Sequence, residues 1–317
     1  MSFYNTQNER NFRVTDPLLR LTNEIEQLRL QLNSCNVDIG LNVNQTGTRG
    51  PFFLPATGSI AIGCEAANST LFEDNQGYQE EDAIAIGHQA GQFSQETLAV
   101  AIGHLAGQFN QLTRSIAIGG EAGNTGQQDR CVAIGRYAGR QDQGTGTSVG
   151  YSTAVGAFAG ELYQRGYATA FGVDAGYDNQ QTYAVAVGSS AGSYNQSTGA
   201  VAVGRNAAFT GQGEFSVAVG LNSGFQNQGN YSVAVGPYAG QTNQSANSIV
   251  LNADSTPLNA ANTGLFAKPV RGLNLPAAGW FQLYYNPTTG EIAYDSTLIF
   301  LKKALSLAEA SCPRDLI

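Results

Sequence analysis

The sequence predicts an all-β solenoid, in which short coils stack so that their strands form parallel sheets along the stack. Three observations carry this prediction. The tripeptide Ala-hydrophobic-Gly occurs eleven times, with glycines sixteen residues apart except for intervals of 24 and 21. Such a period indicates repeated units that bury their apolar faces against one another. Each copy alternates residue types with the period of two typical of a strand. Finally, sixteen residues are too few for two helices but suffice for two short strands and two turns.

Two segments and a linker precede the repeat. Residues 1–14 show no apolar periodicity and are predicted to be a flexible arm, our candidate anchor in an assembly. Residues 15–36 are predicted to form a helix, with Asp16 as N-cap and Pro17 in the first turn. Its apolar residues occupy a and d positions of a coiled coil. They are Leu18, Leu21, Ile25, Leu28 and Leu32, followed by Cys35. The alternative is one amphipathic helix packed on the solenoid. Residues 37–57 are predicted to be a linker.

The predicted β-roll spans residues 58–254. Its repeat glycines are Gly63, Gly87, Gly103, Gly119, Gly135, Gly156, Gly172, Gly188, Gly204, Gly220 and Gly236. Two residues before each glycine stands an alanine: Ala61, Ala85, Ala101, Ala117, Ala133, Ala154, Ala170, Ala186, Ala202, Ala218 and Ala234. β-Branched residues stand three before the glycine, and Ile, Val or Phe171 one before it.

The alternation places the alanines on one face of the strand and the large apolar residues on the other. We expect the large residues to fill the coil and the alanine face to be covered closely by a second chain, since solvent would not select alanine eleven times. The alternative is that alanine alone fits a narrow coil interior. That arrangement would expose two stripes of Ile and Val.

A glutamine stands eight residues after the glycine in ten of the eleven copies, and Leu71 breaks the set. These are Gln95, Gln111, Gln127, Gln143, Gln164, Gln180, Gln196, Gln212, Gln228 and Gln244. Side-chain amides stacked at the strand spacing of about 4.8 Å donate to one neighbour and accept from the other. We therefore expect a glutamine ladder; the alternative is capping of the local backbone.

Residues 255–317 are predicted to form a small C-terminal neck or cap of strands and a helix. Gly264–Arg271 follows a last, degraded repeat at Ser248–Asn252, as is common where a solenoid ends. Asn286–Gly290 is predicted to be a turn between two strands. Residues 296–310 are predicted to be a helix.

Composition excludes several classes of function. Only 13% of residues are charged, the net charge is −8, and no basic groove for nucleic acid is visible. No apolar stretch is long enough for a membrane span, and the N-terminus does not resemble a signal peptide. The four cysteines lack metal-ligand or redox spacing and are expected to be free thiols.

Nothing in the sequence forms a catalytic, cofactor-binding or metal-binding motif, so we do not expect an enzyme. His88 and His104 follow repeat glycines and should stack as solvated turn residues. The loops at Glu73–Asp82 and Gln143–Ser152 interrupt the period and are our candidates for binding surfaces. Aromatic residues between positions 151 and 177 are candidates for stacking on glycans or for ordinary packing. They are Tyr151, Phe158, Tyr163, Tyr167 and Tyr177.

The units Ser115–Gly119 (SIAIG) and Tyr231–Gly236 (YSVAVG) resemble the head repeats of trimeric autotransporter adhesins of the YadA type. This resemblance implies a left-handed parallel β-roll with three chains around one axis. Residues 264–294 are similar to the neck of viral fibre proteins, which precedes a chaperone domain of the endosialidase type. The present sequence ends about 20 residues later, so the self-cleaving serine of that domain cannot be assigned.

These features favour a homotrimeric fibre or spike on the virion, for host attachment or capsid surface decoration. Its partners would be a capsid or other virion protein at the N-terminal arm, and a host receptor or glycan. The alternative is the head of a bacterial cell-surface adhesin that binds matrix protein or glycan.

Overall fold

The computed structural model describes residues 37–39, 58–63, 65–67, 79–146, 150–270, 283–286, 288 and 292–294. The predicted arm, the coiled-coil helix and the C-terminal helix lie outside these ranges. The chain divides into two compact units, Met1–Pro269 and Val270–Ile317.

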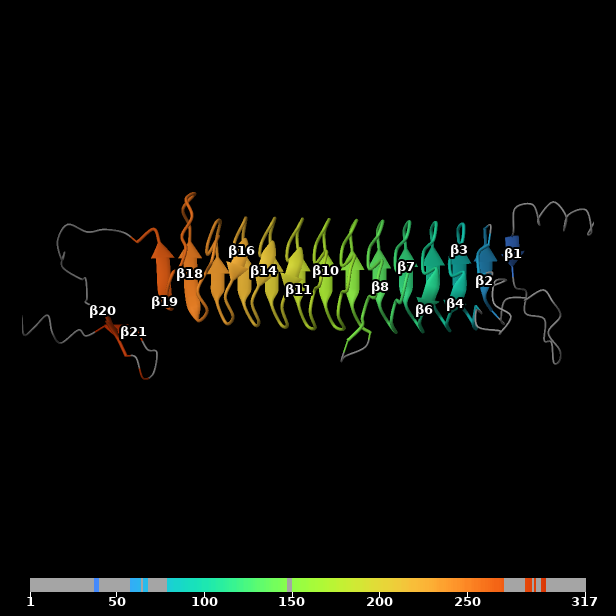
Figure 1. The fold of residues 1–317 in the computed structure, drawn as a ribbon, viewed down its shortest axis with the longest axis horizontal. Helices are drawn as coiled ribbons and strands as arrows, with labels where there is room; N and C mark the ends of the chain where they lie inside the picture. Colours follow the sequence, from blue (N-terminus) through green and yellow to red (C-terminus); the bar gives the residue numbers. More distant parts are fainter. Residues whose placement is uncertain are drawn as a thin grey trace, which may run out of the picture. The chain divides into compact units, whose positions relative to one another are not determined.

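The first unit is a parallel β-solenoid of about 11 turns, each close to 16 residues long (Figure 1). One strand of each coil joins a long sheet that follows the length of the stack. From Val37–Ile39 (β1), which pairs antiparallel with β2, all later pairs in this sheet are parallel. The parallel strands are β2 (Ile60–Ile62), β3 (Ile84–Ile86), β5 (Val100–Ile102), β7 (Ile116–Ile118), β8 (Val132–Ile134), β9 (Thr153–Val155), β10 (Thr169–Phe171), β11 (Val185–Val187), β13 (Val201–Val203), β15 (Val217–Val219), β17 (Val233–Val235), β18 (Ser248–Asn252) and β19 (Gly264–Lys268).

The register of this sheet stacks identical positions of the repeat. Ala186 of β11 lies opposite Ala202 of β13, and the same pairing recurs from coil to coil. The turns accommodate this stacking because the repeat glycine has a positive φ and no side chain. At Gly188, with φ of 125°, a Cβ would lie 2.7 Å from the carbonyl oxygen of Gly204.

The other side of the coil carries shorter sheets. Two strands pair in its first part, β4 (Phe93–Gln95) and β6 (Phe109–Gln111). Three pair in its second part, β12 (Tyr194–Gln196), β14 (Thr210–Gln212) and β16 (Gln226–Gln228). Isolated parallel bridges continue the same rows between them, so the coils remain in register on both sides.

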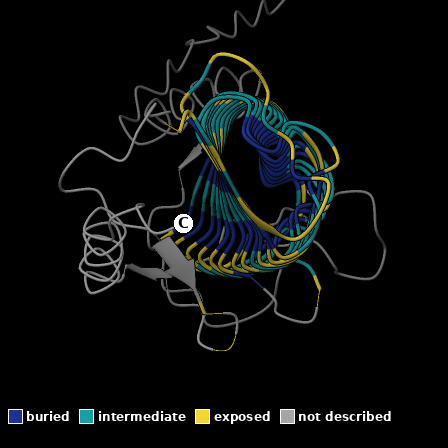
Figure 2. Cartoon of the chain, turned by 90° about the vertical axis from the view of Figure 1, so that its left-hand side faces the viewer, coloured by how far each residue is buried: buried dark blue, intermediate teal, exposed yellow. Residues whose placement is uncertain are grey.

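The repeat alanines lie inside the coil, so the prediction that large residues fill it is wrong. Ala61 is 5% exposed, and each of the other ten alanines is 0% exposed. A second row of alanines, among them Ala191 and Ala207, packs against them. Figure 2, viewed along the stack, shows the buried positions as continuous rows on two sides of the coil. The coil is too narrow for two facing rows of Ile and Val, which is the physical reason for the reversal.

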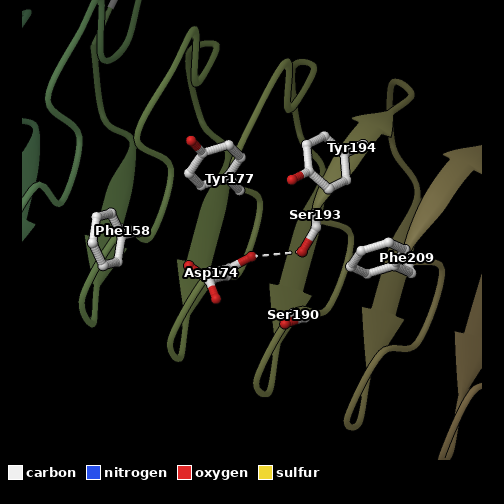
Figure 3. A pocket seen from close by; sticks show the side chains of 7 residues that line it. All are labelled: Phe158, Asp174, Tyr177, Ser190, Ser193, Tyr194 and Phe209. Carbon is white, nitrogen blue, oxygen red and sulfur yellow. Dashed lines mark hydrogen bonds between the residues drawn. The ribbon is translucent and has the colours of Figure 1, made fainter.

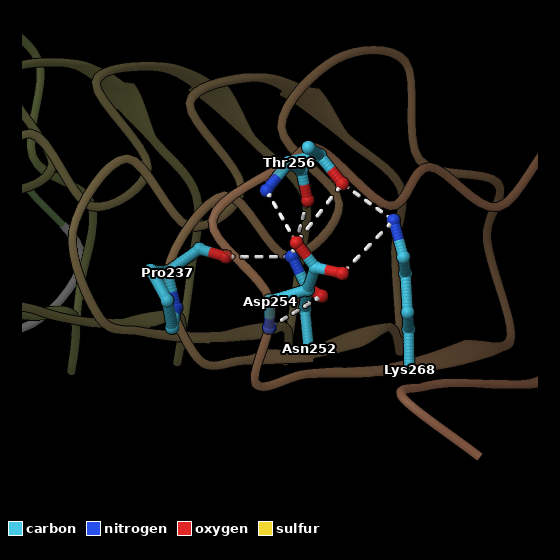
Figure 4. Close-up of polar contacts among 5 residues, drawn as sticks. All are labelled: Pro237, Asn252, Asp254, Thr256 and Lys268. Atoms are coloured by element: carbon cyan, nitrogen blue, oxygen red, sulfur yellow. Dashed lines mark hydrogen bonds and ion pairs between the residues drawn. The ribbon is translucent and has the colours of Figure 1, made fainter. Parts of the chain in front are cut away.

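The last coils close the stack with a polar cluster (Figure 4). Asn252 replaces the repeat glycine, and its side-chain amide donates to the carbonyl oxygens of Pro237 at 2.8 Å and Thr256 at 2.9 Å. Asp254 accepts from the Thr256 backbone amide at 3.0 Å and pairs with Lys268 of β19 at 3.3 Å. The long sheet therefore continues through β19, past residue 254.

The second unit contains a two-stranded antiparallel sheet. Its strands are β20 (Leu283–Tyr285) and β21 (Ile292–Tyr294). The backbone amide of Thr288 donates to the side-chain oxygen of Asn286 at 2.9 Å, as in an Asx turn. The two strands predicted on either side of the turn are therefore present and pair, whereas residues 287, 289 and 290 of the predicted turn lie outside the described residues.

Candidate functional site

The glutamines form a buried ladder along the inside of the coil. From Gln95 to Gln212, each side-chain amide donates to the side-chain oxygen of the next glutamine at 2.9–3.3 Å. The ladder ends at Gln228, because the Gln244 side-chain oxygen accepts no hydrogen bond from the described residues. Each of these amides also donates to the backbone carbonyl eleven residues earlier, as Gln196 does to Val185 at 2.8 Å. The ladder and the backbone capping considered as alternatives therefore occur together. A glycine faces most of these amides, with Ala208 in its place before Gln212; a Cβ at Gly192 would lie 2.7 Å from the Gln196 side-chain oxygen.

Gln79 occupies the ladder position that was assigned to Leu71. Gln79 pairs as an isolated parallel bridge with Gln95. Its side-chain amide donates to the carbonyls of Ile60 at 3.0 Å and Ala83 at 2.9 Å, which are the backbone contacts of the other rungs. It does not donate to the Gln95 side-chain oxygen, which accepts no hydrogen bond from the described residues. The sequence contained a signal for this position: Gln79 stands five residues before the next strand, as most rungs do. The first insertion therefore ends before Gln79, earlier than the predicted loop boundary at Asp82.

The β-branched positions face outward and form two parallel columns over the long sheet. They are at most partly buried, and Phe171 is 56% exposed. The first column holds Ile60, Ile84, Val100, Ile116, Val132, Thr153, Thr169, Val185, Val201, Val217 and Val233. The second holds Ile62, Ile86, Ile102, Ile118, Ile134, Val155, Phe171, Val187, Val203, Val219 and Val235. We call this surface the apolar face. Eleven coils spaced by about 4.8 Å give the apolar face a length of about 50 Å. A monomer normally exposes single, scattered apolar residues, and a continuous apolar surface of this length indicates an interaction site.

A pocket of about 480 Å³ opens on the side of the coil that follows the repeat glycine (Figure 3). It arises where one coil has serine at two positions, Ser190 and Ser193. Along the stack, Phe158 and Phe209 lie at its two ends, and Asp174 lies between them. The local cause is a pair of small residues in columns that carry larger side chains in the neighbouring coils.

Aromatic contacts hold the walls of this pocket in place. The Tyr194 ring lies edge-on to Tyr177, with centroids 5.6 Å apart, and to Phe209 at 5.4 Å. Outside the pocket, Phe225 stacks on Phe209 at 5.2 Å, and Tyr137 stacks on Phe158 at the same distance. The rings therefore support one another over several coils.

Two carboxylates lie in this region, and only one of them lines the pocket. Glu161 is buried and forms an ion pair with Arg140 at 2.8 Å. Burial raises the pKa of Glu161, against the opposing effects of Arg140 and of a hydrogen bond from Tyr177. Burial likewise raises the pKa of Asp174, which lines the pocket. No lysine, arginine or histidine is among the residues that line the pocket.

The aromatic residues that the sequence grouped together separate into two places. Tyr151 and Tyr167 stack at 5.2 Å in an exposed row, which continues to Tyr183 at the same spacing. Phe158 and Tyr177 line the pocket. Tyr163 is exposed near Gln141, which donates to its hydroxyl at 3.5 Å.

The sequence did not single out Asp174, Ser190, Ser193, Tyr194 or Phe209. A comparison of the positions two and five residues after each glycine shows two serines in one coil, flanked by aromatic residues in others. That interruption was the available signal.

The remaining candidate residues form no reactive cluster within the described ranges. His88 and His104 stack with centroids 5.3 Å apart, as expected, and are exposed. No group of three metal-ligating residues was found among the described residues. Cys131 is a buried free thiol, and burial raises its pKa. In the same ranges, no helix has the length and apolar character that crossing a bilayer requires.

The second insertion, Gln143–Ser152, leaves the stack after Gly144 and rejoins it at Gly150. The backbone amide of Gly150 donates to the carbonyl of Gly144 at 2.8 Å, which closes the loop at its base. The loop projects from the row of coils beside β8 (Figure 1). Most of the first insertion lies outside the described residues.

Comparison with known proteins returned no matching family model, no matching curated protein and no matching solved structure.

Proposed function

We propose that each chain is a left-handed β-roll and that three copies assemble through their apolar faces into a trimeric fibre or spike of a virion. The fibre would attach the particle to its host or decorate the capsid surface. The observation that carries this proposal is the apolar face itself: eleven strands each present two outward residues, most of them Ile or Val.

The magnitude of this surface argues for a partner. Complete burial of a Val or Ile side chain stabilises by about 1.5–3 kcal/mol, and these side chains are already partly buried. A further contribution of about 0.5–1 kcal/mol from each of the two residues on eleven strands amounts to roughly 11–22 kcal/mol per chain, of the same order as the roughly 4–15 kcal/mol that association costs or larger. The apolar face is therefore large enough to drive assembly when most of it is covered.

Two features suit the assembly to display. The buried ladder and the stacked turns make each solenoid stiff along its length, so a trimer would hold its loops at a fixed distance from its anchor. Three identical loops at fixed spacing also convert weak single contacts into strong attachment. In this proposal the helix at residues 15–36 sets the register of three chains as a coiled coil, and residues 1–14 anchor the fibre to a virion protein.

Sedimentation velocity on the full chain tests the assembly. The wild type should sediment as a species of about 100 kDa, three times the 33.3 kDa chain mass. Replacing Val187 and Val203 together by lysine places charges on the apolar face and should shift the species toward monomer. The matched control replaces two exposed polar residues, Asn195 and Asn227, by lysine and should leave the mass unchanged. A wild type that remains at the chain mass would contradict the proposal.

The location needs a separate test. Mass spectrometry of purified virus particles from infected cells that express the gene should find this chain at a stoichiometry divisible by three. Its absence from the particles would exclude the virion role while leaving the assembly result intact.

A further inference from the structure

We infer that the pocket between Phe158 and Phe209 binds a neutral pyranose, such as a hexose residue at the end of a surface glycan. The inference rests on the proposed attachment role and gives it a ligand class. The pocket itself lies within one chain and uses residues outside the apolar face, so its binding can be measured apart from assembly.

The pocket offers apolar walls and hydrogen-bonding groups on adjacent surfaces. Phe158, Tyr177, Tyr194 and Phe209 supply aromatic area. The Ser193 hydroxyl is buried and donates to the Asp174 backbone carbonyl at 2.8 Å, so the partly exposed Ser190 is the serine whose hydroxyl can contact a ligand. A pyranose matches this combination because it has apolar C–H faces and a rim of hydroxyl groups.

The Asp174 carboxylate selects for hydroxyl donors. Its side chain makes no hydrogen bond or ion pair with any other described residue, although it lines the pocket and is half-buried. An ionised carboxylate only accepts hydrogen bonds. Its two oxygens can accept from two neighbouring hydroxyl groups of one sugar ring. A ligand with adjacent hydroxyl groups would supply the donors that the protein does not.

Charge and shape argue against two other ligand classes. An anionic ligand would meet Asp174 with no cation among the lining residues. A quaternary ammonium group needs aromatic rings within about 6 Å of the cation. Here Tyr194 lies edge-on to Tyr177 and Phe209, so the three rings do not form a cage with their faces around one cation. The volume of about 480 Å³ suits a sugar ring better than so compact a group.

Ligand-observed NMR titrations of the full chain with methyl glucoside, methyl galactoside and methyl mannoside test the inference, with choline and sialic acid as comparison ligands. At least one hexoside should bind, and choline and sialic acid should not. Asp174→Asn should weaken the binding about tenfold or more, because a hydrogen bond to a charged group is lost. Asp178→Asn is the matched control, since Asp178 lies in the same coil outside the pocket lining; it should bind as the wild type does.

A second variant fills the pocket without a new backbone conformation. Ser190 has a φ of 55°, and the equivalent positions of other coils, Tyr137, Phe158 and Tyr238, hold aromatic residues at φ of 56–60°. Ser190→Tyr should therefore fold and lose hexoside binding. The inference is overturned if no hexoside binds, if choline or sialic acid binds instead, or if both pocket variants bind as the wild type does.

Sedimentation of the same samples separates this inference from the proposed function. A trimer that binds no hexoside would refute the pocket and keep the assembly. A monomer that binds a hexoside would keep the pocket and refute the assembly.

Discussion

Replacing Gln196 by leucine should remove one rung of the buried ladder at nearly constant side-chain volume. Gln196 is 0% exposed, and its amide donates to Val185 at 2.8 Å, Ala200 at 3.3 Å and Gln212 at 3.1 Å. Its oxygen accepts from Gln180 at 2.9 Å. After the substitution, the Gln212 side-chain oxygen is left buried without the donor it had. A buried unsatisfied acceptor costs about 1–3 kcal/mol, and each further lost hydrogen bond about 1 kcal/mol. The three further lost hydrogen bonds bring the cost to roughly 4–6 kcal/mol, and burial of the apolar leucine side chain offsets about 2 kcal/mol of it. The free energy of unfolding should therefore fall by roughly 2–4 kcal/mol.

Urea unfolding followed by circular dichroism, at one fixed protein concentration, measures this loss. Gln226→Leu is the matched control, because Gln226 is the same residue type in strand β16 but is exposed. It should change the free energy of unfolding by no more than about 0.5 kcal/mol. If Gln196→Leu is as stable as the control variant, the ladder does not stabilise the coil and the reasoning fails.

Three further predictions follow from the coil interior. Ala202→Val should lower the free energy of unfolding by about 1–3 kcal/mol through overpacking, and an unchanged urea midpoint would show that the interior has spare room. Cys131 in the native protein should react with iodoacetamide far more slowly than in urea, since burial raises its pKa; peptide mass spectrometry measures both rates, and equal rates would refute its burial. Burial raises the pKa of Glu161 in the folded state, so ionisation of this carboxyl lowers the free energy of unfolding at pH values above the folded-state pKa. This loss of stability disappears below the unfolded-state pKa of about 4.3, where the carboxyl is protonated in both states. The wild type should therefore gain stability relative to Glu161→Gln as the pH is lowered from 7 to about 4, and a constant difference between the two urea midpoints would contradict this.

The period of the repeat was enough to predict the solenoid, its strands and the position of the ladder. The solenoid, its strands and the ladder all follow from residue types that recur at a fixed spacing. Such a repeat can be recognised in a single sequence without comparison to others. Ala186 and Ala202 had to lie opposite one another once the coils stacked at a period of 16. The same regularity placed Gln180 and Gln196 within hydrogen-bonding distance.

The orientation of the strands was not predictable from alternation alone. Alternation separates two faces but does not say which one is inside. The inside is decided by the width of the closed coil, where Ala202 must share space with Ala207 and the Gln196 side chain must lie against Gly192. That width is a property of the closed coil as a whole. The reversal also changes the assembly argument, because the surface left uncovered carries Ile and Val in place of alanine.

The pocket escaped the sequence prediction for a different reason. Asp174 and Ser190 are ordinary turn residues when each repeat is considered alone. They become a site only because Phe158 and Phe209 are brought to either side of them by stacking. Sites of this kind lie across repeats, so they follow from a comparison of neighbouring coils.

A cryo-electron microscopy map of the purified full chain would test the central claim most directly. The account predicts three solenoids around one axis, with the columns of Val201 and Val203 facing that axis and Ala202 inside each coil. A single solenoid with a bare apolar face, or chains joined through other columns, would contradict it.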